Sequence, residues 1–241
     1  NFALTTHEEF KKGVSDLKQQ GMRKLILDLR GNSGGVMDAA TMIADEFLPE
    51  GKLIVYTMGK STARQEIKAT SRGDFEEGEL VVLIDEWSAS SSEILAGAVQ
   101  DNDRGTIIGR RSFGKGLVQE PVMFRDGSGM RLTIARYYTP TGRSIQKPYD
   151  EGIEKYYEDL GNRMMRGEFE EADSIRMDDS LRFTTPGGRI VYGGGGIMPD
   201  IFIPIDTTGI SDYFLAIRNS GLIYRYALKF TEEKRDAMKK Y

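Results

Sequence analysis

The sequence contains no cysteine and only one histidine among its 241 residues. Without cysteine the chain has no disulfide, no thiol nucleophile and no thiolate ligand for a metal. The single histidine, His7, excludes any site that needs two imidazoles from one chain and leaves one candidate base for a Ser-His-Asp triad. An enzyme of this composition is therefore expected to transfer protons through another group. We expect it to use no metal and no cofactor.

Long apolar segments are also absent. Residues 80–84 form one of the longest apolar runs, and they are strand-sized, far short of the roughly 20 residues that a membrane helix needs. No secretory signal is visible in the sequence. The formal net charge of −4 gives no overall excess of basic residues, so we expect no nucleic acid as a partner.

The order of local signals predicts an α/β fold. Thr6 and Glu9 match a capping box that opens a helix ending near residue 21, and apolar spacing predicts further helices over residues 37–47 and 94–100. Five short segments have strand signals: residues 25–29, 53–58, 65–70, 80–84 and 106–109. Because strands and helices alternate, we expect parallel pairing, with residues 25–29 and 80–84 as buried strands.

Later segments add a different kind of pairing. Residues 117–124 and 130–138 have strand signals and flank Asp126-Gly127, which is typical of a hairpin turn. A hairpin contributes antiparallel strands. The sequence therefore predicts one mixed sheet.

Charge is unevenly distributed along the second half of the chain. Residues 104–147 carry nine basic against two acidic side chains, and residues 150–182 carry eleven acidic against five basic ones. The basic residues alternate along the predicted strands, which indicates mainly solvated strand faces, with some role in holding carboxylates. The acidic stretch is typical of a surface helix or helical insertion, and residues 213–241 are predicted to be helical with a break at Gly221.

A group of serines follows the strand at 80–84 and begins a predicted helix. Ser88, Ser90, Ser91 and Ser92 all compete for the role of a nucleophile, because a helix N-terminus offers free N–H groups for an oxyanion. The structural alternative is strong, since Ser90 and Glu93 form a capping box by themselves.

A lysine lies on a turn between two glycines, Gly114 and Gly116. Burial of a lysine favours its neutral form, and a neutral amine can accept a proton from a serine hydroxyl. Gln119 follows Lys115 by four residues and could orient that amine. A surface turn or a phosphate-binding loop would look similar, although no Walker motif is present. In the same way, Asn32-Ser33-Gly34-Gly35 could bind an anion or form a plain turn.

These blocks occur together in one known family. They are Leu27 to Gly35, Ser88 to Ile94, Phe113 to Gln119 and Tyr138 to Gln146, in this order. They resemble the carboxyl-terminal processing proteases, the tail-specific members of the S41 serine peptidases. The resemblance extends over residues 1 to about 205. It implies a ClpP/crotonase-like core with a mixed β-sheet, and a serine endopeptidase that cuts unfolded or tail-exposed proteins near their C-terminus.

The resemblance also implies which residues carry the chemistry. In the family pattern the nucleophile lies 25 residues before the lysine, which selects Ser90 as the nucleophile and Lys115 as the base. Gln119 matches the glutamine that follows the family's lysine. Glu93 and Asp101 match acidic positions, which we interpret as supporting rather than chemical.

The oxyanion hole is implied to consist of backbone amides. One donor would be the N–H group of Ser91, next to the nucleophile, and the other that of Gly34 or Gly35. The sequence does not distinguish between the two glycines.

The same comparison suggests a domain organisation. Residues 1–205 would form the peptidase core, with the acidic insertion at about 150–182, and residues 206–241 a helical C-terminal extension. In simpler members a Gly-Ile-x-Pro-Asp block follows soon after the Ser-Ile-Gln block, whereas here residues 196–200 come about 50 residues later. No part of the chain fits the PDZ domain that the family usually carries, so we expect that domain to be absent here.

The expected partners follow from the family. They are a protein or peptide with an exposed C-terminus and the PDZ domain of the full-length protein, and the family leaves room for a homo-oligomer. The expected location is the bacterial cell envelope, most simply the periplasm. One alternative is a binding or scaffold module that keeps the fold without activity, although both Ser90 and Lys115 are present. Another is a nonproteolytic α/β hydrolase, but no Gly-x-Ser-x-Gly elbow surrounds the serines.

Overall fold

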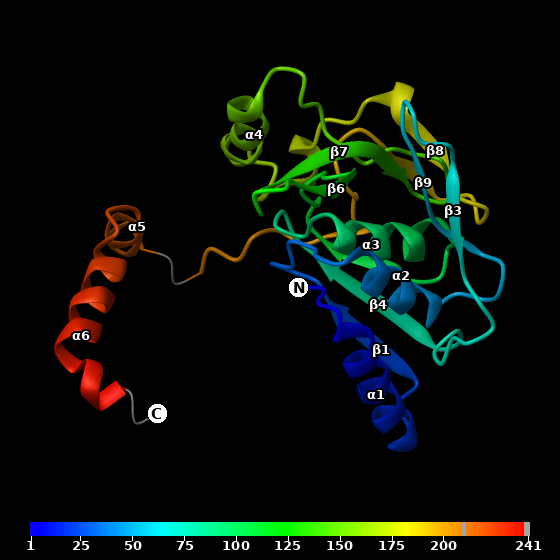
Figure 1. Ribbon diagram of the computed structural model, residues 1–241, viewed down its shortest axis with the longest axis horizontal. Coiled ribbons are helices and arrows are strands. Elements are labelled where there is room, and N and C mark those ends of the chain that lie inside the picture. Colours follow the sequence, from blue (N-terminus) through cyan, green and yellow to red (C-terminus); the bar gives the residue numbers. More distant parts are fainter. Residues whose placement is uncertain (209–210, 239–241) are drawn as a thin grey trace. The chain divides into compact units, whose positions relative to one another are not determined.

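The computed structural model describes residues 1–208 and 211–238 and divides into two compact units, Asn1–Pro204 and Ile205–Tyr241. Figure 1 shows the order of the elements along the chain. The larger unit contains the helices α1 (Thr6–Gln19), α2 (Met37–Asp45), α3 (Ser91–Asp101) and α4 (Ile153–Met165). Its strands are β1 (Lys24–Asp28), β2 (Leu53–Met58), β3 (Gln65–Lys68), β4 (Glu79–Ile84), β5 (Thr106–Gly109), β6 (Leu117–Met123), β7 (Gly129–Tyr138), β8 (Arg182–Thr184), β9 (Ile190–Tyr192) and β10 (Ile201–Phe202).

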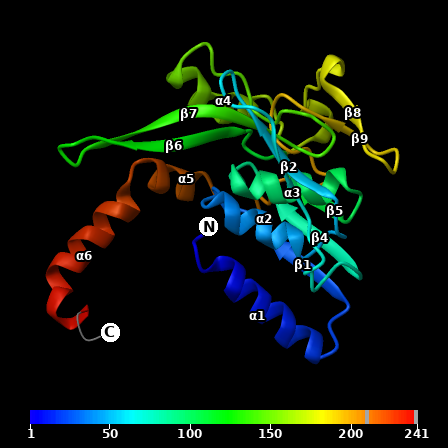
Figure 2. The same ribbon diagram turned by 45° about the vertical axis from the view of Figure 1, so that its right-hand side comes forward.

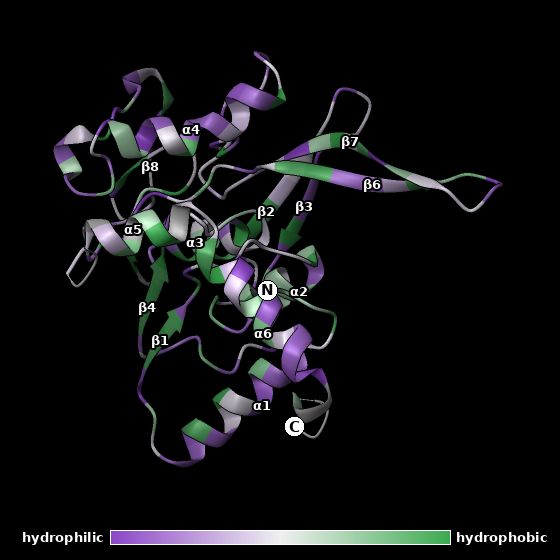
Figure 3. Cartoon of the chain, turned by 90° about the vertical axis from the view of Figure 1, so that its left-hand side faces the viewer, coloured by the Kyte–Doolittle hydropathy of each residue, from purple (hydrophilic) through white to green (hydrophobic). Residues whose placement is uncertain are grey.

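A parallel sheet carries the strand that leads into the serine turn. Its order is β1-β4-β5-β10, and all three pairings are parallel. On β4, Leu80, Val82 and Ile84 are buried, as expected from an apolar run in a sheet. β1 differs from the prediction of a buried strand, because it lies at the sheet edge and leaves Ile26 67% exposed. Figure 3 shows the hydrophobic character of both strands.

A separate antiparallel sheet has the order β3-β2-β7-β6. β6 and β7 form the hairpin around Asp126-Gly127, and it extends away from the rest of its unit (Figure 2). The α/β class with antiparallel additions is confirmed, but the parallel and antiparallel strands do not share one mixed sheet. β2 explains the difference, because it pairs antiparallel with both β3 and β7 and never joins the parallel strands.

Two helices lie between these sheets and form the centre of the core. In Figures 1 and 2, α2 and α3 separate the β1/β4 sheet from the β6/β7 sheet. Every residue of α3 is buried, so the helix whose N-terminus carries Ser90 has no solvent-facing side. α1 contacts the end of α2 and the residues after it, where the Phe10 ring meets Phe47 edge to face at 5.6 Å.

The acidic stretch is largely irregular apart from α4. Two short 3₁₀ turns follow, at Ala172–Ser174 and Asp179–Leu181, before the small β8–β9 hairpin. The smaller unit contains α5 (Asp212–Asn219) and α6 (Leu222–Met238), with Gly221 between them at φ 70°. Within the described ranges, no helix combines the length and the apolar character that crossing a membrane requires.

The capping box that the sequence predicts at Thr6 and Glu9 is wrong. The N-cap of α1 is Thr5, and the Thr6 hydroxyl already belongs to the helix and accepts a hydrogen bond from Ala3 N–H at 2.8 Å. The single histidine lies on this helix, where His7 Nε2 is 2.8 Å from Glu46 Oε1. Its contact is therefore with the end of α2 rather than with the serine turn.

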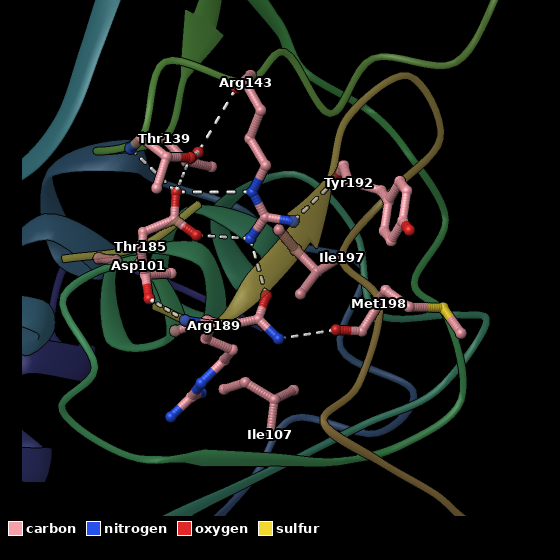
Figure 4. Close-up of polar contacts among 12 residues, drawn as sticks. Asp101, Ile107, Thr139, Arg143, Thr185, Arg189, Tyr192, Ile197 and Met198 are labelled. Carbon is pink, nitrogen blue, oxygen red and sulfur yellow. Dashed lines mark hydrogen bonds and ion pairs between the residues drawn. The ribbon is translucent and has the colours of Figure 1, made fainter. Parts of the chain in front are cut away.

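The far end of α3 is fixed by a buried ion pair. Arg143 and Asp101 both have fully buried side chains, and Arg143 Nη2 donates to Asp101 Oδ1 at 2.6 Å (Figure 4). The same guanidinium donates to Gln100 Oε1 at 2.7 Å and to the Tyr192 carbonyl at 2.8 Å. Asp101 also accepts from the Thr141 hydroxyl. This network joins α3, the 139–143 turn and β9.

Replacement of Arg143 by Met should lower the free energy of unfolding by about 3–5 kcal/mol, because Asp101 would remain as a buried charge without its partner. Urea denaturation measures the change. Lys24→Met is the matched control, since the Lys24–Glu79 pair is 71% and 72% exposed and should contribute little. Equal stability of the Arg143→Met variant and the parent would contradict this account.

Candidate active site

The serine turn begins where β4 leaves the sheet and ends at the first turn of α3. Ser90 is the N-cap of α3 and adopts φ 57° and ψ −116°. A positive φ is unusual for a residue with a Cβ, and such backbone strain costs about 1–3 kcal/mol. With Asp103, Ser90 is one of two non-glycine residues with positive φ in the described ranges. The backbone at Ser90 therefore departs from that of an ordinary helix N-cap.

The structure separates the four candidate serines by their contacts. The hydroxyls of three of them donate to backbone carbonyls of the segment after β1: Ser88 to Leu29 at 2.8 Å, Ser91 to Gly35 at 2.9 Å and Ser92 to Asn32 at 2.8 Å. Those three bonds attach the serine turn to the β1 loop. Among the residues described, Ser90 is the member of the group whose hydroxyl makes no such bond.

A cleft of about 670 Å³ opens beside Ser90. Three of the four sequence blocks meet there, together with the N-terminal residues and the β6–β7 hairpin. Its lining residues are Asn1, Phe2, Ser33, Gly34, Gly35, Val36, Met37, Ser90, Ser91, Ile94, Lys115, Leu117, Val118, Gln119, Pro121, Arg131 and Tyr137. The structure thus brings Ser90, Lys115, Gln119 and both glycines to one cleft.

Glu93 joins the serine turn to the lysine turn. Its carboxylate is fully buried and accepts a hydrogen bond from Ser90 N–H at 2.8 Å and from Lys115 N–H at 2.9 Å. The other oxygen accepts from Gly114 N–H at 2.7 Å and from the Ser112 hydroxyl. Burial raises the pKa of Glu93 above its ordinary value, while these four hydrogen bonds act in the opposite direction.

Tyr137 makes a second connection between the same two turns. Its hydroxyl oxygen lies 3.0 Å from the Ser90 carbonyl and 2.5 Å from the Lys115 carbonyl. Burial, with a smaller contribution from Glu93, raises the pKa of Tyr137 well above its ordinary value, so the hydroxyl remains a donor. Sequence reasoning missed this residue. Its only signal was an aromatic side chain near the end of a predicted hairpin strand.

Gln119 lies in the cleft but does not bond to the lysine. Its amide nitrogen is 3.4 Å from the Thr133 hydroxyl on β7, at the edge of hydrogen-bond range. The β6–β7 register shifts between Val118 and Gln119, so the strand is irregular at this point. Asp101, the other acidic position singled out, lies at the far end of α3 in the Arg143 network.

The two glycines are not equivalent. Gly34 N–H donates to the side chain of Asn32 at 3.0 Å, and Gly34 itself fits against the serine turn only because it has no Cβ, which would lie 2.7 Å from Ser90 Cβ. Gly35 pairs with Phe2 in a parallel bridge. In such a bridge the bonds to Phe2 come from the residues on either side of Gly35, so its own N–H and C=O face the opposite way.

Gly35 therefore faces the serine turn, as its carbonyl shows by accepting from the Ser91 hydroxyl. Within residues 1–208 and 211–238, neither Gly35 N–H nor Ser91 N–H has a hydrogen-bond partner. Two free N–H groups beside Ser90 are suited to binding a negatively charged oxygen. In the same ranges no group of three or more His, Asp or Glu side chains could hold a metal ion.

Comparison with known proteins identifies the family. A model of peptidase family S41 matches residues 1–158. The chain belongs to peptidase family S41. It is 40% identical over 146 residues to the carboxyl-terminal-processing protease of Synechocystis, covering 61% of this chain and 34% of that protein. It is 37% identical over 182 residues to the carboxy-terminal-processing protease of Bartonella bacilliformis, covering 69% and 42%.

A solved structure supports the same S41 assignment. The photosystem II D1 C-terminal processing protease superposes with a TM-score of 0.60 at 29% identity, covering 84% of this chain and 40% of that one. The chain thus spans roughly a third to two fifths of the length of these S41 relatives.

Glu93→Gln should destabilise the fold, because an amide offers one acceptor oxygen where the carboxylate offers two. The N–H groups that then face the amide nitrogen lose their acceptor, at about 1–3 kcal/mol for each buried donor. Urea denaturation measures the loss, and Glu9→Gln, on the exposed face of α1, is the control. A Glu93→Gln variant as stable as the control would show that the carboxylate does not hold the two turns.

Proposed function

We propose that this chain carries the active site of a serine endopeptidase in which Ser90 is the nucleophile and Lys115 the base. The observation that carries the proposal is the pair of connections through Glu93 and Tyr137. Each contacts both the Ser90 turn and the Lys115 turn at the backbone. Such connections are expected where a nucleophile and its base must keep a fixed separation. The strained backbone at Ser90 supports the same proposal.

The proposed reaction follows from these positions. The Ser90 hydroxyl attacks a peptide carbonyl while the neutral Lys115 amine takes its proton. The oxyanion that forms is held by the N–H groups of Ser91 and Gly35. Lys115 then gives its proton to the leaving amine. A water molecule then gives a proton to the Lys115 amine and attacks the carbonyl carbon of the acyl-enzyme. The ester bond to Ser90 breaks, and the Lys115 ammonium returns the proton to the Ser90 oxygen.

Gln119 has a supporting place in this proposal. Its side chain lines the cleft with Lys115 and contacts Thr133 only at 3.4 Å, a contact that is easily exchanged. An amide oxygen turned toward the lysine would accept a hydrogen bond from one of the amine's N–H groups and direct the amine's lone pair at Ser90. Glu93 acts behind the cleft, through the backbone.

Ser90→Ala and Lys115→Ala should each lower the rate of protein cleavage by a factor of about 10³ or more, since a nucleophile and its base act as one unit. Casein digestion and labelling by a serine-reactive phosphonate measure turnover and nucleophile reactivity separately. Ser61→Ala and Lys60→Ala, both exposed, are the matched controls. Undiminished cleavage by either site variant would refute the assignment. If the parent protein binds peptides but neither cleaves them nor reacts with the phosphonate, the scaffold alternative holds.

We further propose that the substrate is a protein with an exposed C-terminus. Two cationic side chains line the cleft, Lys115 and Arg131, and the lining residues include no carboxylate. Arg131 lies opposite Pro121 on the β6–β7 hairpin, and within the described ranges it takes part in no ion pair or side-chain hydrogen bond. A guanidinium in this position is suited to a terminal carboxylate, which it can bind through two parallel hydrogen bonds.

Arg131→Gln should lower kcat/KM about tenfold for a peptide with a free C-terminal carboxylate and leave the C-terminally amidated peptide unaffected. Comparing the two peptides in each variant isolates the effect of the peptide's terminal carboxylate charge on kcat/KM. Arg125→Gln, in the exposed hairpin turn and outside the cleft, is the control. Equal losses for both peptides would assign Arg131 a role other than carboxylate binding.

The remaining elements of the proposal concern the whole protein. We propose residues 1–205 as the peptidase core, with the insertion at 150–182, and residues 206–241 as a separate helical extension. In the full-length protein, a PDZ domain would present the substrate's terminus, and the location would be the cell envelope. The similarity to carboxyl-terminal processing proteases supports these elements.

A further inference from the structure

The acidic insertion contains two of the most deeply buried charged side chains in the chain. Arg163, on the last turn of α4, has a fully buried side chain, and Glu168 is 2% exposed. Arg163 Nε donates to Glu168 Oε1 at 2.7 Å. Arg111 joins them from the core and donates to both oxygens of Glu168 at 2.7 Å. The insertion is therefore attached to the core by an ion-pair network rather than by a loose surface contact.

The two terminal nitrogens of the Arg163 guanidinium bind the backbone that precedes Lys115. Its Nη1 donates to the Ser112 carbonyl at 3.0 Å and its Nη2 to the Arg111 carbonyl at 2.6 Å. These are consecutive carbonyls, three and four residues before the lysine. All three nitrogens of the guanidinium thus have acceptors. Two of the three bind peptide carbonyls of residues 111–115, the lysine loop.

The same loop is held from its other side by Glu93, which accepts from Ser112, Gly114 and Lys115. It is also covered by α4. The Tyr156 ring meets Phe113 edge to face at 5.7 Å, and Lys147 Nζ lies 3.9 Å from the centre of the Phe113 ring. Residues 111–115 therefore run between an anchor in the core and an anchor in the insertion.

We infer that the acidic insertion positions the lysine for catalysis, with Arg163 as the positioning residue. The inference rests on the proposed role of Lys115. None of the cleft-lining residues comes from the insertion, so Arg163 acts through the backbone of Arg111 and Ser112 and not on substrate. Burying an arginine is expensive, and a well-packed apolar side chain is often as stable in its place. The charged pair therefore adds little stability, and its contribution is to fix the position of the lysine loop.

Arg163→Met removes both carbonyl contacts. A displacement of the lysine by about 1 Å is enough to slow the reaction roughly 100-fold, so kcat should fall by about that factor. KM should stay near the parent value, because the cleft keeps its lining. Arg166→Met, which removes an exposed arginine three residues along the same segment, should change neither quantity.

The single substitution leaves Glu168 with one arginine and could unfold the insertion. The triple substitution of Arg163, Glu168 and Arg111 by Met removes the whole charged network, which restores stability in comparable cases but leaves the two carbonyls without their donor. Thermal denaturation reports the fold, and phosphonate titration of Ser90 counts the competent sites, so that kcat is expressed per site.

A triple variant with restored stability, a low kcat and an unchanged KM would support positioning. Restored stability together with parental kcat would overturn it and assign the pair a purely structural role. A low kcat with a KM raised in proportion would also overturn it, since the insertion would then shape substrate binding. Ser90→Ala and Lys115→Ala are run in parallel. If they still cleave substrate, the proposed function fails; if they do not, the result for Arg163 tests this inference alone.

Discussion

The buried carboxylate of Glu93 is the constraint on which the rest of the site depends. A carboxylate enclosed in the core without a cation is costly, and this one is offset by four donors from two separate turns. Ser90, Ser112, Gly114 and Lys115 must therefore all lie within hydrogen-bond distance of one side chain. The separation between the serine turn and the lysine turn follows from that requirement, because neither turn can move without leaving a buried polar group unpaired.

Each of the two sheets positions a different part of this site. In the parallel sheet, the strand β4 ends and leads into the serine turn. The antiparallel sheet carries Tyr137, whose hydroxyl contacts the carbonyls of both turns. α3 lies between the sheets and is fixed at one end by Glu93 and at the other by the Asp101–Arg143 pair. A helix held at both ends by buried charges keeps its N-terminal N–H groups in a constant direction, which an oxyanion site requires.

The sequence predicted what depends on local pattern and missed what depends on distant partners. The strand at 80–84, the helix after it and the pairing of Ser90 with Glu93 follow from spacing and were correct. The different hydrogen bonding of Gly34 and Gly35 depends on the bridge to Phe2, more than 30 residues away along the chain. The burial of Arg163 could not be predicted, because its segment is acidic overall. Such a composition predicts a solvated surface and does not identify a single buried arginine. The roles of Ser90 and Lys115 stay predictions.

The proposed use of Lys115 as the base would account for where these contacts fall. A lysine amine is carried on four flexible carbons, so its position is only as well defined as the backbone beneath it, whereas an imidazole is rigid and can be oriented through its second nitrogen. Glu93, Tyr137 and Arg163 all bond to peptide groups of residues 111–115 and not to the amine. In the proposed mechanism, a base on so flexible a side chain is thus positioned mainly through its main chain. For that reason, the residues that govern turnover in this site are expected behind the cleft, and those that govern substrate binding along its surface.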